Sequence, residues 1–136
     1  MKTADEIVGA VGFSVMTVRP GDTCLAMGIS DLPILAPGHL MSVMESACVA
    51  ALVELLENGE TTIVDKFDIS LIDSIGIGVE VRSTARCIEV FDRTMIFECD
   101  VYDGERHIAY ARIERTAVER VSFLARTAAQ SLIKPS

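Results

Sequence analysis

The spacing of hydrophobic residues changes at Asn58-Gly59, which separates two kinds of predicted structure. Before this pair, the segment from Gly38 to Glu57 contains no helix breaker. It follows Pro37, which suits the first turn of a helix because the N–H that proline lacks has no intrahelical partner there. The pattern predicts one long helix. Its apolar residues cover almost the whole circumference, so we expect other structure to surround it.

After Gly59 apolar and polar residues alternate, as they do in β-strands. Strands are predicted over 11–18, 62–71, 79–91, 94–102 and 107–118, with a loop before the long helix, a hairpin turn at Asp103-Gly104 and a terminal helix over 119–133. One antiparallel sheet curved around the long central helix satisfies this order and gives an α+β fold. Such a sheet has a free edge and uncovered apolar area. We therefore expect a homodimer, and a tetramer stays open.

Composition limits the classes of function. A chain of 136 residues can form one core, and we expect a single domain over residues 1–136. Glu45 and Glu54 interrupt the best candidate for a membrane span, and the N-terminal residues lack the features of a secretion signal, so we expect a cytoplasmic protein. The net charge of −8 disfavours binding to nucleic acid. The four cysteines form no CxxC pair, and no metal or resident cofactor is expected.

One segment carries a resemblance to a known family. The sequence GHLMSVMESACVAALVELLENGE, residues 38–60, resembles the active-site helix of the fluoroacetyl-CoA thioesterase family of hotdog proteins. A weaker likeness extends over residues 31–118. The resemblance implies a hotdog fold and a small acyl-CoA ligand in a cleft between two copies of the chain.

The resemblance also assigns positions, and two of the three catalytic ones are substituted. Members of this family use a threonine, a glutamate and a histidine; the glutamate corresponds to Glu45, whereas Pro37 and Leu71 stand at the other two positions. Val64 replaces a glycine that lies close to the substrate. Of a late Gly-Thr-His-Glu-Arg pattern only the last two residues remain, as Glu114-Arg115. Proline and leucine can neither attack a thioester nor carry a proton.

Glu45 is the strongest single candidate. An ionised carboxylate enclosed by apolar neighbours costs several kcal/mol unless it is paired, so its presence in this helix favours a functional role, against the alternative of a helix side that is partly open to water. It could act as general base for a water molecule. Backbone N–H groups near Gly38 and His39 could stabilise the oxyanion. Ser42 and Cys48, each three residues away, share the Glu45 face.

Further candidates have an ordinary structural role as the alternative to a functional one. His39 is about 120° away from Glu45 around the helix, which favours a surface or dimer contact. Asp65 interrupts the apolar face of its strand and could face the site, although a β-bulge would reverse this. Three arginines could form a patch for the coenzyme phosphates, or simply face solvent: Arg82, Arg86 and Arg112.

Two functions fit these residues, and a third fits less well. The first is an acyl-CoA thioesterase in which Glu45 activates water. The second is a non-hydrolytic module that binds an acyl-CoA or a small carboxylic ligand and has lost the catalytic threonine and histidine. A hotdog-type dehydratase is less favoured, because neither His39 nor His107 stands at a convincing position for a histidine with an acidic partner.

Overall fold

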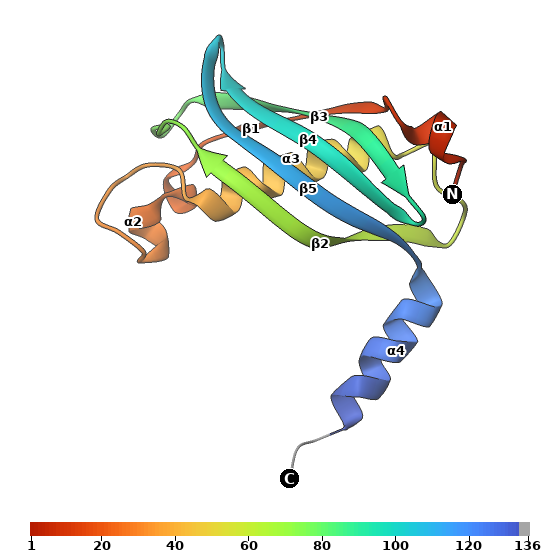
Figure 1. Cartoon of the computed structure of the whole chain (residues 1–136). Coiled ribbons are helices and arrows are strands. Elements are labelled where there is room, and N and C mark those ends of the chain that lie inside the picture. The colour runs from red at the N-terminus through yellow and green to blue at the C-terminus, as the bar shows by residue number, and fades with distance from the viewer. Residues whose placement is uncertain (134–136) are drawn as a thin grey trace.

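The computed structural model describes residues 1–133, which fold as one curved antiparallel sheet with a long helix on one face (Figure 1). The elements, in chain order, are α1 (Ala4–Ile7), β1 (Val11–Thr17), η1 (Pro20–Asp22), α2 (Cys24–Met27), α3 (Pro37–Ala51), β2 (Glu60–Leu71), β3 (Glu80–Phe91), β4 (Thr94–Asp103), β5 (Arg106–Glu119) and α4 (Arg120–Leu132). The predicted α+β class, five strands and terminal helix are confirmed. The short α1, η1 and α2 were not predicted.

The strands lie in the order β1-β3-β4-β5-β2. The last three strands of the chain form the predicted meander, and the hairpin between β4 and β5 turns at Gly104, where φ is 59°. The strand that follows α3 does not pair with the next strand of the chain; it lies beside β5 instead. As a result β1 and β2 are the two edges of the sheet.

α3 packs mainly on β1 and β3 and has little contact with β2 (Figure 1). Its buried side is formed by Leu40, Val43, Met44, Ala47, Cys48 and Ala51. β1 approaches the helix closely at Gly12, where a Cβ atom would overlap the carbonyl oxygen of Ala47 and the backbone nitrogen of Ala51. Only glycine permits this contact. The inner face of β2 is therefore left partly open.

Two expectations about the long helix were wrong. The helix ends at Ala51 rather than Glu57, because the chain continues in tight turns in which the N–H of Leu55 bonds to Leu52. The carbonyl of Leu55 in turn accepts the N–H of Lys2. The helix is also not surrounded: Val49 and Val53 are exposed, so its apolar circumference is buried on one side only in the single chain.

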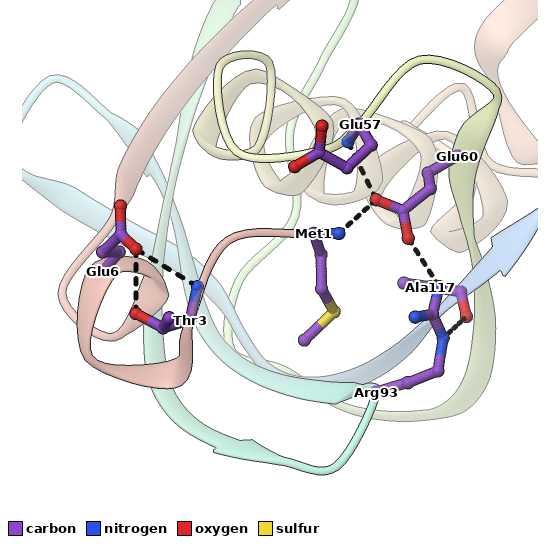
Figure 2. A network of polar contacts seen from close by, with 7 residues as sticks. All are labelled: Met1, Thr3, Glu6, Glu57, Glu60, Arg93 and Ala117. Carbon is purple, nitrogen blue, oxygen red and sulfur yellow. Dashed lines mark hydrogen bonds and ion pairs between the residues drawn. The ribbon is translucent and has the colours of Figure 1, made fainter.

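A polar network joins the start of β2 to distant parts of the chain (Figure 2). The Glu60 carboxylate accepts hydrogen bonds from the N-terminal amine of Met1, from the N–H of Glu57 and from Arg93. Arg93 also donates to the carbonyl of Ala117, 3.0 Å away. The network connects β2, the β3–β4 turn and the end of β5. It therefore fixes the point from which α4 leaves the sheet.

Candidate functional site

Glu45 lies at the partly open side between α3 and β2, and it is paired with a buried arginine. Arg115 Nη1 donates to Glu45 Oε1 over 3.0 Å. The Arg115 side chain is 7% exposed and the Glu45 side chain 39% exposed. The expectation of an enclosed carboxylate was therefore wrong in the single chain. The charge that is taken out of water belongs to the arginine, and the carboxylate balances it.

Arg115 is held by β2 from its other side. Its Nε donates to the Thr62 hydroxyl over 2.9 Å, and Nη2 donates to the Thr62 carbonyl over 3.1 Å. Val64 is paired with Arg115 in the β2–β5 register and is half-buried beside it. The guanidinium group is thus fixed in place. One carboxylate oxygen of Glu45 is engaged, while Oε2 accepts no hydrogen bond from the described residues.

Gly38 shares a face of α3 with Glu45. They are seven positions apart, which is about two turns and about 10 Å along the helix axis. A Cβ at Gly38 would meet open space, and its N–H has no protein partner within residues 1–133. The N–H of His39, by contrast, already donates to the carbonyl of Ala36 over 3.0 Å. Of the two predicted oxyanion donors, only Gly38 remains available.

The two substituted positions meet in one cavity. Pro37 at the start of α3 and Leu71 at the end of β2 both line a hollow of about 200 Å³, together with Leu40 and Ile75. Glu45 is not part of its lining. Two positions that the resemblance assigns to the active site are therefore neighbours in space, but their side chains are apolar.

Ser42 and Cys48 flank Glu45 without forming a reactive group. Ser42 donates to the carbonyl of Gly38, one turn earlier, over 3.1 Å. Cys48 is fully buried, with its Sγ 3.6 Å from that of Cys99. The hydrogen bond with Cys48 and burial raise the pKa of the Cys99 thiol, which keeps it protonated and unreactive.

Both histidines have an aspartate partner, and neither lies at Glu45. His39 Nε2 is 3.8 Å from Asp22 Oδ1. His107 Nε2 is 2.8 Å from Asp100 Oδ1, and its ring stacks on Tyr102. Asp100 is paired with Tyr110 on the sheet face that points away from α3. The dehydratase hypothesis gains no support, because neither histidine shares the Glu45 site.

Asp65 is the extra residue of a β-bulge, and the expectation that it faces the site was wrong. Val64 is paired with Arg115 and Lys66 with Glu114, so Asp65 has no partner in the register. Its carboxylate accepts a hydrogen bond from Thr116. Paired residues point to the same face, which places Asp65 on the outer face of the sheet.

The three arginines proposed for coenzyme binding do share a face, but it is this outer face. Arg86 and Arg112 are each paired in register with Glu98, and Arg112 is also next to Asp68. Acidic neighbours therefore offset the charges of Arg86 and Arg112. A ligand beside Glu45 would not meet Arg112 of the same chain.

Two kinds of feature are absent from residues 1–133. No group of three or more His, Cys, Asp or Glu side chains is placed to hold a metal ion there. None of the helices in this part of the chain is both long enough and apolar enough to cross a membrane.

The residue that sequence reasoning missed is Arg115. Its signal was the surviving Glu-Arg end of the late family pattern, which the sequence shows at Glu114-Arg115. Strand alternation along β5 turns Arg115 towards α3 and Glu114 away from it, and the bulge in β2 lets Val64 and Lys66 pair with these two residues. Spacing alone could not reveal the pair, because Glu45 and Arg115 are 70 residues apart.

Comparisons with known proteins show the family and the fold of this chain. The family model described as fluoroacetyl-CoA-specific thioesterase matches residues 18–121. A solved mutant of the fluoroacetyl-CoA thioesterase FlK, in complex with fluoroacetate, is 24% identical with a TM-score of 0.84, covering 94% of this chain and 98% of that one. A hot-dog-like protein from Thermanaerovibrio acidaminovorans is 17% identical with a TM-score of 0.84, covering 96% and 98%. A hypothetical protein of Thermus thermophilus, described as a thioesterase superfamily member, is 20% identical with a TM-score of 0.83, covering 91% and 92%. No curated protein matches.

Proposed function

Because this chain belongs to the fluoroacetyl-CoA-specific thioesterase family, we propose that it hydrolyses a small acyl-CoA thioester, with Glu45 as the general base. The observation that carries the proposal is the Glu45–Arg115 pair. A buried arginine holds one carboxylate oxygen in a fixed position, and the other oxygen is free on the partly open side of the sheet. A half-exposed carboxylate held in this way can take a proton from water.

The reaction needs few groups. Glu45 removes a proton from water while the water oxygen attacks the thioester carbonyl carbon. The C–S bond of the tetrahedral intermediate then breaks, and the proton returns from Glu45 to the sulfur, which gives a carboxylic acid and coenzyme A. The free N–H of Gly38, at the positive end of α3, is the donor for the oxyanion.

The site is proposed to be completed in a homodimer. The half-buried inner side chains of β2, including Phe67 and Ile69, receive little cover from α3, and β2 has a free edge. A second copy that pairs with this edge would cover them. We also propose that the protein is cytoplasmic.

A non-hydrolytic binding module remains the second candidate, because one observation favours it. Pro37 and Leu71 make the cavity of about 200 Å³ apolar at the two positions where the family has its hydroxyl and its proton carrier. Such a cavity could hold the acyl group without contributing to its hydrolysis.

The test compares hydrolysis by the wild type, Glu45→Gln and Glu54→Gln with short, branched and aromatic acyl-CoAs. Glu54 is exposed just beyond α3. Glu54→Gln therefore removes the same charge as Glu45→Gln, but at a position outside the site. We expect Glu45→Gln to lower the rate by about 100-fold or more and Glu54→Gln to leave it unchanged. Coenzyme A release that is equal in wild type and Glu45→Gln would exclude the proposed base.

A double variant separates the two candidates. If the wild type binds acyl-CoA in calorimetry and does not hydrolyse it, while Pro37→Thr with Leu71→His gains hydrolysis, the binding module is the correct function. Absence of both binding and hydrolysis with every acyl-CoA would contradict both candidates.

A further inference from the structure

α4 leaves the sheet without a partner in its own chain (Figure 1). None of its residues is buried. Four of its apolar residues nevertheless lie at helical spacing along one side, which we call the α4 stripe: Val121, Leu124, Ala128 and Leu132. Val121 is 71% exposed and Leu132 82% exposed. A regular apolar side of this kind indicates a missing contact surface.

The direction of α4 is fixed at its base. The Glu119 carboxylate accepts the N–H groups of Val121 and Ser122, and the N–H of Arg120 donates to the carbonyl of Gly59 over 2.7 Å. An isolated helix of 13 residues is marginally stable in water. A capped and anchored helix of this length needs packing along its stripe to persist.

The anchor places α4 beside the free edge of the sheet. The helix begins next to Glu60, at the start of β2, and extends beyond β2 away from the other strands (Figure 1). If two β2 strands pair antiparallel, the Glu60 end of one strand lies beside the Leu71 end of the other. We propose that α4 of one copy packs on the second copy at the Leu71 end of its β2, over the mouth of the cavity lined by Pro37 and Leu71. This inference rests on the homodimer proposed above.

The receiving surface has matching chemistry. Leu71 and the next residue, Ile72, are each about half exposed, which gives the stripe an apolar surface to cover. Asp73 follows them; it is exposed, and its carboxylate is paired with Arg106 of the same chain over 2.7 Å. α4 carries Arg120 and Arg126 and no acidic residue.

Charge over the whole chain also favours a second copy. All 20 acidic residues precede α4, and three of the 12 basic residues follow Glu119, so residues 1–119 carry a net charge of −11. A basic helix is attracted to such a surface. The negative net charge of residues 1–119 would repel an anionic membrane, which is the other common partner of a basic amphipathic helix.

The consequence is that each cavity is closed by the other subunit. The cavity mouth, open in the single chain, would be covered by the stripe of the partner's α4, and the acyl group of a ligand would be shielded from water there. The contact therefore belongs to the ligand site as well as to the dimer.

Cross-linking tests the position of α4. The four native cysteines are buried, so they should not react with maleimides in the folded protein. In the double variant Leu124→Cys with Ile72→Cys we expect a short bismaleimide to give covalent dimers several-fold more often than in the matched control, Gln130→Cys with Ile72→Cys. Gln130 lies on the side of α4 opposite to the stripe. Equal yields in the two variants would overturn the proposal.

Charge variants test the energetic contribution. We expect Leu124→Glu to raise the dimer dissociation constant about tenfold or more in sedimentation experiments, and Gln130→Glu to leave it unchanged. Both positions are exposed in the single chain, and circular dichroism confirms that each variant is folded. An unchanged constant in Leu124→Glu, or a wild type that sediments as a monomer, would overturn the inference.

Two outcomes distinguish the dimer contact from membrane binding and from a failure of the proposed function. Co-sedimentation of the wild type with phosphatidylglycerol vesicles, lost in Leu124→Glu, would assign the stripe to a membrane and overturn the dimer contact. Cross-linking at α4 in a protein that neither binds nor hydrolyses acyl-CoA would leave the inference standing and contradict only the proposed function.

Discussion

Glu60 illustrates how a single carboxylate contributes to stability away from the proposed site. It accepts hydrogen bonds from the N-terminal amine, the Glu57 N–H and Arg93 (Figure 2). The bond to the N-terminal amine contributes most, and together these partners lower the pKa of Glu60 from 4.5 to about 2. The ionised form is therefore favoured by folding.

The sign of the pH dependence follows from this shift. Because the folded-state pKa is lower than the unfolded one, the contribution of Glu60 is fully present above about pH 4.5 and is lost as the pH falls towards about 2. Glu60→Gln should lower the free energy of unfolding at pH 7 by about 1–3 kcal/mol, and the difference from the wild type should shrink between pH 4.5 and 2. Urea unfolding across this range measures it.

Glu57→Gln is the matched control. Glu57 is exposed and contributes its backbone N–H to the network rather than its carboxylate. A difference between Glu60→Gln and the wild type that stays constant from pH 7 to 2 would show that ionisation of Glu60 does not stabilise the fold.

At the scale of elements, the contact of β1 with α3 is the tightest in the fold. A methyl group at Gly12 would overlap backbone atoms of α3, which cannot move without displacing the helix. Gly12→Ala should destabilise the protein by about 1–3 kcal/mol or more. Gly21→Ala, where a Cβ meets no atom, should change stability by less than about 1 kcal/mol. Thermal unfolding of both variants measures the contrast, and equal melting temperatures would disprove the close contact.

Local patterns predicted most of the elements. Alternation located all five strands, and Pro37 marked the start of α3, because both signals depend on residues near one another in sequence. The end of α3 could not be predicted, since the Leu55 carbonyl bonds to Lys2 from a distant segment. The bulge at Asp65 was an open alternative rather than a prediction, because it depends on the register of β2 against β5.

The candidate site was predicted less completely than the fold. Glu45 was identified because a carboxylate in an apolar helix is unusual, but its exposure depends on which side of α3 the sheet covers. The role of Arg115 depends on its pairing with Glu45, 70 residues away in sequence, so the sequence revealed Arg115 only as part of a family pattern. Arg112 and Asp65 were assigned to the site although both lie on the outer face.

At the scale of the whole molecule, the single chain leaves apolar surface uncovered at β2 and α4. Leu71, Ile72, Val121 and Leu132 are at least half exposed. A homodimer that covers them would couple folding to association. We expect the melting temperature to rise with protein concentration, by a few degrees for each tenfold increase. Calorimetry at several concentrations measures this, and a constant melting temperature would argue against a homodimer linked to folding.

The bulge in β2 has a consequence for how the length of this chain can vary. Residues 60–64 pair with 119–115 and residues 66–71 pair with 114–109, so Asp65 alone separates two regular blocks. Deletion of Asp65 would join the blocks into one continuous ladder. Val64 would still face Arg115, and Phe67 would still face inward. Relatives that lack one residue at this position could therefore differ in length without disturbing the contacts around Glu45.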